Sequence, residues 1–374
     1  MENKKFIGGL LIIGVIFLAI SPSYGQIIYG QPAAGSLQTI YSHWSLKNDS
    51  TTTKINQFTI PVNGFIPLGD NFETQVYVAG SSNDFSRPGN DYSLSGLSDF
   101  RIQASHSFSN DRFLMSLGLN LPTGKKELDQ TKERAIIDLL SENYLAFPLR
   151  RFGEGFGFNL LLGGATMLGA MRCGGGVMYQ YNGSYTPYTN DENYKPGDFF
   201  SVNANANMKF GKTTLTTDVI YTNYASDKQD EDKIFRQSPQ LDLRLGANYD
   251  EPSYGIAGNA RYLIRGRHTS YDVVTGAILS QLKIYGNEFS INGMFLYHPG
   301  EKWSLGPILE FRLTADNEEG LGNSSLFGAG AAYTRRLGSS LVFDLGFRYY
   351  SGSADGGNID LSGLQFTSGL RASF

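Results

Sequence analysis

The sequence predicts an all-β protein: a transmembrane antiparallel up-and-down β-barrel of about sixteen strands, with fourteen as the alternative count. Three observations carry this prediction. The chain of 374 residues begins with an export signal, alternates apolar and polar residues over many short segments, and ends on an alternating segment closed by Phe374. Alternation with a period of two is the pattern of a strand that has one apolar and one polar face.

The closing segment, residues 360–374, shows the pattern most clearly. A core strand of a soluble β domain is the alternative, but such a strand would leave an unprotected edge, whereas a barrel pairs its last strand with its first. Outer-membrane barrels resemble this arrangement, because they commonly end on a C-terminal Phe. The resemblance implies recognition of the strand ending at Phe374 by the barrel-assembly machinery. The apolar face holds Leu364, Phe366, Leu370, Ala372 and Phe374.

Residues 1–25 have the composition of a secretory signal peptide. Two lysines precede the apolar run 6–20, and Ser23 and Gly25 supply the small residues that a signal peptidase requires. A membrane-spanning helix needs about 20 residues, so the run is too short to be one. We therefore expect a signal peptide at 1–25, a short periplasmic segment at 26–36 and the barrel at 37–374.

The strand pattern is weak at 37–46 and clear from residue 56 onward. Between 200 and 210, apolar residues take the even positions from 202 to 208, and Ser or Asn takes the odd positions. Four alternating segments lie between 56 and 121. The count depends on 37–46 and on 271–287, which fits one strand or two. Further strands are expected at 155–168, 172–186, 197–210, 212–225, 237–250, 254–267, 279–298, 302–315, 324–336, 339–351 and 360–374.

Short turns at Gly211-Lys212, Asn110-Asp111 and Glu251-Pro252 keep the like faces of neighbouring strands together. The expected pairings are Met208 with Leu215, Phe108 with Phe113, Leu245 with Gly258, and Asp242 with Arg261.

Longer polar connections alternate with these turns, and we expect the short turns on the periplasmic side and the long loops outside. The expected long connections are 81–95, 122–154, 187–196, 226–236, 268–278, 316–323 and 352–359.

The second face of the strands carries charged residues. An Arg on the lipid side would cost about 2–4 kcal/mol at the midplane, so these residues belong in a polar interior. They either form a structural network that fills the lumen or line a pore. Their signs are nearly balanced, so no strong ion selectivity follows. The candidate lumen residues are Glu73, Asp99, Arg101, Asp218, Asp242, Arg244, Arg261, Arg265, Glu310, Arg312, Asp344, Arg348 and Arg371.

The longest connection, 122–154, is expected to be extracellular and to contain a helix within 125–141. A loop of this length in a regular barrel is often functional. One hypothesis is a lid that folds over or into the mouth and narrows it. The alternative is a surface helix that rests on other loops. The candidate lid residues are Pro122, Thr123, Gly124, Ile136, Leu139 and Leu140.

Three short stretches, 96–100 (Gly-Leu-Ser-Asp-Phe), 119–124 (Leu-Asn-Leu-Pro-Thr-Gly) and 194–198 (Tyr-Lys-Pro-Gly-Asp), carry a family resemblance. They resemble the outer-membrane family named for the MetA pathway of phenol degradation, which is itself similar to hydrophobic-substrate channels. The resemblance implies passive passage of small, often aromatic or hydrophobic, solutes and brings no catalytic residues. The fatty-acid transporter relatives have an N-terminal hatch segment, and we find no counterpart of it in this sequence. The resemblance therefore does not imply that solutes leave sideways through the barrel wall.

The residues needed for other chemistry do not form recognisable patterns. The four histidines lack the spacing of metal ligands, so no metal site and no cofactor are expected. A net charge of −4 gives no indication of nucleic-acid binding. The expected partners are outer-membrane lipid, lipopolysaccharide and a small-molecule solute.

The sequence therefore predicts a non-enzymatic outer-membrane channel for passive uptake of small solutes. A structural or surface-interaction barrel with a closed lumen is the first alternative. A barrel enzyme that uses His268 and Ser270 near the outer rim is the second.

Overall fold

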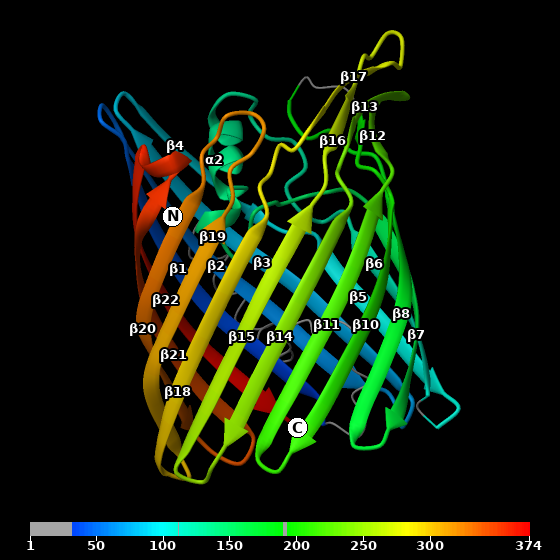
Figure 1. Ribbon diagram of the computed structural model, residues 1–374, viewed down its shortest axis with the longest axis vertical. Coiled ribbons are helices and arrows are strands. Elements are labelled where there is room, and N and C mark those ends of the chain that lie inside the picture. Colours follow the sequence, from blue (N-terminus) through cyan, green and yellow to red (C-terminus); the bar gives the residue numbers. More distant parts are fainter. Residues whose placement is uncertain (1–31, 111, 190–192) are drawn as a thin grey trace, which may run out of the picture.

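The computed structural model describes residues 32–110, 112–189 and 193–374. Sixteen antiparallel strands form one closed barrel, as Figure 1 shows, so the predicted fold and strand count are confirmed. The barrel strands are β1 (Ala34–Lys47), β2 (Thr52–Pro67), β3 (Phe72–Arg87), β5 (Phe100–Phe108), β6 (Phe113–Leu121), β7 (Gly157–Leu168), β8 (Met171–Asn182), β10 (Phe199–Phe210), β11 (Thr213–Tyr224), β14 (Gln240–Asp250), β15 (Tyr254–Arg265), β18 (Glu288–Gly300), β19 (Trp303–Thr314), β20 (Ser324–Arg336), β21 (Leu341–Ala354) and β22 (Ile359–Ser373).

The first and last strands close the barrel. Their pairing runs without a shift from Ala34 opposite Ser373 to Lys47 opposite Asp360. The first strand begins at Ala34, inside the segment 26–36 that was expected to precede it. The predicted signal peptide, 1–25, lies outside the described residues.

The outer surface of the barrel is apolar. Large hydrophobic side chains are exposed on alternate positions of successive strands, for example Leu117 on β6, Leu162 on β7 and Val202 on β10. The neighbouring positions on the same strands carry Ser116, inside and almost fully buried, and other polar residues. This is the arrangement that the period-two pattern predicts. Among the described residues, no helix is both long and apolar enough to cross a membrane.

The two ends of the barrel differ. The end that holds Ala34 and Ser373 has short turns, such as Gly211-Lys212 between β10 and β11. The opposite end has the long connections. Two expected hairpin pairings, Met208 with Leu215 and Phe108 with Phe113, are confirmed.

The expected register at Glu251-Pro252 is wrong by two residues. Leu245 pairs with Ala260 instead of Gly258, and Arg261 pairs with Arg244 instead of Asp242. The turn is longer than expected, because the backbone N–H of Glu251 bonds to the carbonyl of Tyr254. A shift of two residues keeps every side chain on its predicted face, so the pattern could not reveal it.

Several expected connections are in fact strands. Residues 81–95 belong to a hairpin in which β3 continues and pairs with β4 (Asn90–Leu97). The expected strand 279–298 is divided into two strands, of which only β18 lies in the barrel wall. Above the wall lies a five-stranded sheet formed by β9 (Tyr194–Lys195), β12 (Ser226–Gln229), β13 (Asp232–Arg236), β16 (His268–Tyr271) and β17 (Ile278–Leu282). These segments are polar because they extend beyond hydrocarbon and need no apolar outer face.

The connection between β6 and β7 contains helix α2 (Lys132–Leu140) and the 3-10 turn η1 (Asn143–Leu145). The helix is shorter than the expected 125–141. Asp129 Oδ1 accepts hydrogen bonds from the backbone N–H groups of Thr131 and Lys132, which satisfies donors at the helix start. Figure 1 shows α2 at the same end of the barrel as the β16–β17 hairpin. A second 3-10 turn, η2 (Asp355–Gly357), connects β21 to β22.

A charge introduced on the outer face should destabilise the barrel, whereas a charge introduced on the inner face should not. Leu117 lies at the middle of β6 and is 47% exposed on the outside. We expect Leu117→Arg to destabilise the barrel in lipid by about 2–4 kcal/mol, because the guanidinium would face hydrocarbon. The measurement is reversible guanidinium unfolding in lipid vesicles.

The matched control is Gln103→Arg on β5, which faces inward beside Gly118, the residue that follows Leu117. Its new charge would meet water, so its unfolding midpoint should stay near that of the wild type. Equal losses for the two variants would contradict the assignment of the faces.

Candidate functional site: the lumen and its inserted loop

The long loop between β6 and β7 is anchored where the wall strand is interrupted. Between β4 and β5 the residues Ser98 and Asp99 leave the strand pairing. There the backbone N–H of Asp99 bonds to the carbonyl of Phe152 at 3.0 Å, and that of Lys125 bonds to the carbonyl of Leu97 at 3.2 Å. Both arms of the loop therefore attach to the same break in the wall.

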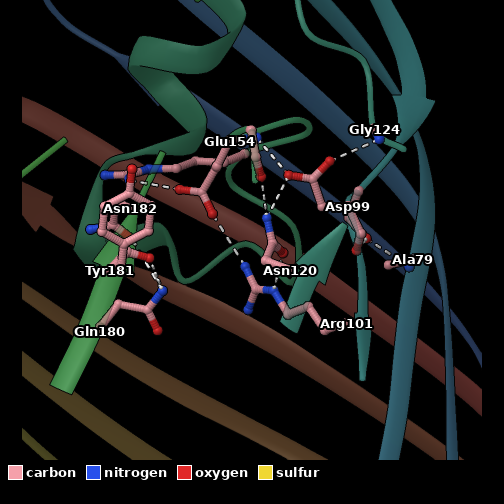
Figure 2. A network of polar contacts seen from close by, with 12 residues as sticks. Ala79, Asp99, Arg101, Asn120, Gly124, Glu154, Gln180, Tyr181 and Asn182 are labelled. Carbon is pink, nitrogen blue, oxygen red and sulfur yellow. Dashed lines mark hydrogen bonds and ion pairs between the residues drawn. The ribbon is translucent and has the colours of Figure 1, made fainter. Parts of the chain in front are cut away.

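Asp99 holds this anchor together, as Figure 2 shows. Its carboxylate accepts hydrogen bonds from the backbone N–H of Gly124 at 2.8 Å, the backbone N–H of Glu154 at 2.7 Å, and Asn120 Nδ2 at 2.8 Å. Asp99 is only 2% exposed, so these donors replace the water that the charge has lost. This carboxylate, one of the candidate lumen residues, lies outside the cavity lining and fixes the base of the loop.

At the anchor, the backbone segments lie so close together that positions 124 and 153 have room only for glycine. A Cβ atom on Gly124 would lie 2.7 Å from the carbonyl oxygen of Phe152, and one on Gly153 would lie 2.6 Å from that of Lys125. Both distances are shorter than van der Waals contact allows. Gly124 ends the Leu-Pro-Thr-Gly stretch. The preceding Pro122 and Thr123 are exposed, and Thr123 Oγ1 accepts a hydrogen bond from the backbone N–H of Phe100.

From this anchor the loop turns inward and packs against one part of the wall. Ile136 and Leu140 of α2 are fully buried, and Leu139 packs against the same cluster. The wall side of the cluster comes from inward-facing residues near the long-loop ends of β1–β4 and β20–β22. They are Trp44, Leu46, Ile55, Ala79, Phe85, Leu94, Leu326, Tyr350, Ala354 and Leu361.

Polar contacts fix the deepest part of the loop. Gln57 on β2, fully buried, donates to the carbonyl of Leu149 at 2.7 Å and accepts from the Leu149 backbone N–H at 3.2 Å. On the other side, Arg312 on β19 donates to the carbonyl of Tyr144 at 3.0 Å. The loop therefore lies inside the mouth and is not confined to the surface.

The part of the lumen that the loop does not fill is a cavity of about 1330 Å³. Its lining runs from Tyr194 and His268 at the long-loop end to Leu114, the second residue of β6, near the short-turn end. The loop contributes residues to the cavity wall as well, among them Tyr144, Arg150 and Glu154.

Six of the predicted lumen residues line this cavity, and they are Glu73, Arg101, Arg261, Arg265, Glu310 and Arg312. Most of them are ion-paired. Asp242 Oδ2 lies 2.7 Å from Arg244 and 2.8 Å from Arg261. The other pairs in this region are Arg265 with Glu288 at 2.8 Å, Arg312 with Glu310 at 2.6 Å, and Arg101 with Glu154 at 3.2 Å.

The remaining predicted residues lie elsewhere on the wall. Asp218 is paired across the strands with Arg244. Arg371 and Asp344 form an ion pair at 2.5 Å near the short-turn end, and Arg348 donates to Gln365 at 3.2 Å. These groups are separate from the cavity lining.

Sequence reasoning missed the loop's own contribution to the lining. Arg150, Arg151 and Glu154 lie within the connection 122–156 and have no strand pattern around them. Glu288 was missed because it lies at the start of β18, whose beginning was misplaced. The two adjacent arginines, Arg150 and Arg151, next to the glycines at 153 and 155, are a local signal that could have identified this part of the loop.

Asp227 and His268 are among the groups at the long-loop end whose pKa values are shifted. Burial raises the pKa of the Asp227 carboxyl on β12, although hydrogen bonds from the Tyr194 hydroxyl at 2.6 Å and from the Gly197 backbone N–H oppose the shift. Burial lowers the pKa of His268, whose ring stacks on Phe235.

The proposed catalytic pair is not assembled. His268 is 1% exposed, and neither of its ring nitrogens hydrogen-bonds to Ser270. Within the residues that the structure describes, no group of three or more His, Cys, Asp or Glu side chains could hold a metal ion.

A closed antiparallel sheet with an apolar outer surface and a polar interior defines the class of this protein: it is an outer-membrane β-barrel. The end with short turns and both barrel termini is then periplasmic, and the end with the inserted loop is extracellular.

No family model and no curated protein sequence matches the chain. It is similar in structure to OmpT, an outer membrane protein of Vibrio cholerae, at 11% identity and a TM-score of 0.41, covering 91% of this chain and 96% of that one. It is also similar to the CymD monoaromatic hydrocarbon channel (12%, 0.42, 92% and 89%) and to OprB of Pseudomonas putida in its low-pH structure (9%, 0.44, 90% and 92%). Likenesses this weak carry no functional argument, and the MetA resemblance rests on its short motifs.

The anchor can be tested with Asp99→Asn. The amide loses one acceptor and places an NH₂ group against backbone donors, which costs about 1–3 kcal/mol. We expect local release of the loop and roughly tenfold faster trypsin cleavage after Lys126 and Lys132.

Asp70→Asn, at an exposed periplasmic turn, is the control with the same chemical change. The barrel should remain folded in both variants. Wild-type cleavage rates in Asp99→Asn would show that the carboxylate does not secure the loop.

Proposed function

We propose that this protein is an outer-membrane channel through which small solutes pass by diffusion. The observation that carries the proposal is the asymmetric placement of the inserted loop. The loop packs on the long-loop ends of β1–β4 and β20–β22 and leaves open a cavity of about 1330 Å³, which is lined by the loop and by residues of strands from β2 to β19. A barrel of sixteen strands encloses more space than its own side chains fill, so an aqueous path is physically reasonable.

The lining residues suit a solute that has both an apolar part and polar groups. Tyr77, Tyr144 and Tyr224 line the cavity together with charged and amide side chains. Aromatic walls with a few oriented polar groups are typical of sites that bind small organic molecules. Together with the MetA resemblance, this favours small aromatic or hydrophobic solutes. Passive transport requires neither a cofactor nor a catalytic group from the protein.

A closed structural barrel is the second candidate. The observation in its favour is the apolar cluster between the loop and the wall, which seals the lumen on that side. Such a barrel would carry no current, so conductance separates the two candidates.

A cysteine test locates the conducting path. Ser290 lines the cavity, while the adjacent Ile291 is 46% exposed on the outer face. In a Cys173→Ser background, we expect Ser290→Cys to lose single-channel conductance stepwise when a charged methanethiosulfonate is added to the aqueous phase. The reason is that the added group occupies the path.

Ile291→Cys is the matched control and should be unaffected, because its thiol faces lipid. Absence of any conductance in the unmodified protein would refute the channel and favour the closed barrel.

Deletion of 126–143 tests the role of the loop. This change removes α2 and the apolar residues that seat it, so the extracellular mouth widens. We expect larger single-channel conductance in planar bilayers than in the wild type. An unchanged conductance, in a variant that still shows the heat-modifiable mobility of a folded barrel, would refute a narrowing role for the loop.

A further inference from the structure

Three arginines of the wall are close neighbours in the strand pairing. Arg244 pairs with Arg261, Arg261 pairs with Ser290, and Ser290 pairs with Arg312, across β14, β15, β18 and β19. Neighbouring strands are about 4.8 Å apart, so this row of arginines spans about 15 Å across the strands. Their acidic partners, Asp242 and Glu310, are each two residues from an arginine of the row on the same strand.

The inserted loop presents one more arginine toward this row. Arg150 lines the same cavity as Arg261 and Arg312, and Arg312 also donates to the carbonyl of Tyr144 in the same loop. The guanidinium of Arg150 donates to Asn143 Oδ1, a neutral acceptor. Among the described residues, no carboxylate lies within ion-pairing distance of Arg150. Glu288, the acidic group that interacts with it most, is already paired with Arg265 at 2.8 Å.

The way the loop packs on the wall places Arg150 at the cavity. Leu145, Phe147 and Leu149 are buried against the wall, while the residues between them, and Arg150, remain partly exposed. This irregular segment therefore places its buried side chains on the apolar cluster, while Arg150 lines the cavity. Burial lowers the pKa of Arg150, and so do the neighbouring arginines, whereas Glu288 raises it. A bound anion would stabilise the charged form of Arg150 and so oppose the effects of burial and of the arginines.

We propose, on the basis of the channel function above, that Arg150 together with Arg261 and Arg312 forms a binding site for the carboxylate group of a permeating organic acid. A guanidinium pairs with a carboxylate through two parallel hydrogen bonds, and Arg150 has donors that no acidic group within the described part of the chain takes up. The site is open to the cavity on one side, so a bound acid can enter and leave.

The surroundings favour an acid with an aromatic ring. Tyr144 lines the cavity beside Asn143, and the Tyr285 ring lies 5.9 Å from the guanidinium of Arg265. A planar solute can pack against these rings while its carboxylate meets Arg150. Benzoate is the simplest probe with both features.

The test measures ionic current through the full mature protein in planar bilayers with a KCl gradient. We expect a reversal potential that indicates preference for chloride, and a current that benzoate reduces in a concentration-dependent way. Benzyl alcohol, which has the ring without the charge, should have little effect. In Arg150→Gln we expect the reversal potential to move toward zero and the block by benzoate to weaken about tenfold.

Two variants control for charge and folding. Arg150→Lys keeps the charge and should retain anion preference with weaker block, because it loses the paired donors. Arg87→Gln makes the same substitution at an exposed position of the β3–β4 hairpin and should behave as the wild type.

Several outcomes would overturn the inference. A conducting channel that prefers cations, or one in which benzoate blocks the wild type and Arg150→Gln equally, refutes the site and leaves the channel intact. Block by inorganic phosphate at the same concentration as benzoate refutes the assignment to carboxylates. If no current flows, the channel function fails, and calorimetric titration of benzoate into wild type and Arg150→Gln in detergent then tests the site itself; equal heats would refute it.

Discussion

The structure depends on the pairing of β1 with β22. In hydrocarbon, an unpaired backbone N–H or C=O group costs several kcal/mol, so a membrane-spanning sheet has to close on itself. Here the closure runs from Ala34 opposite Ser373 to Lys47 opposite Asp360, with no shift of register. Closure after sixteen strands also fixes the circumference. The resulting interior is too wide for the inward side chains to fill, and that excess space is what the inserted loop occupies in part.

The loop stops where the wall ceases to be apolar. On β1, Trp44 faces inward and packs in the cluster with the loop, whereas Ser42, two residues nearer the periplasm on the same face, is polar. On β2, Ile55 belongs to the cluster, and Gln57 is the next residue on that face. Gln57 bonds to both backbone groups of Leu149, which ends the insertion with satisfied polar groups. On β1 and β2, the edge of the loop therefore coincides with a change of residue type along the inner wall.

The fold was predictable because its pattern is local. Alternation can be recognised in a few residues, so the sixteen strands and the faces of Leu117 or Val202 followed from the sequence. The extended β3–β4 hairpin was misjudged for a related reason: beyond the membrane a strand needs no apolar outer face, so residues 81–95 resembled a polar loop.

The site was less predictable because its contacts are distant in sequence. Gln57 and Leu149 are 92 residues apart, and Arg312 and Tyr144 are 168 apart. No periodic pattern indicates such contacts. Asp99 shows the consequence, since its position on a strand face predicted a lumen residue, and its actual neighbours make it an anchor. A sequence signal was nevertheless present: Trp44 and Ile55 are large apolar residues on the face that should be polar, and such residues need something to cover them.

The loop buries part of its chain and exposes its charge within a few residues. Leu145, Phe147 and Leu149 are buried on the wall, whereas Arg150, the next residue, is partly exposed and lines the cavity. The packing of the loop on the wall therefore also determines the position of Arg150. A change that loosens the apolar face would also displace the arginine, so stability of the insertion and chemistry of the lumen cannot be varied independently in this segment. Only a substitution that alters the Arg150 head group, and leaves Leu145 and Leu149 in place, separates the two effects.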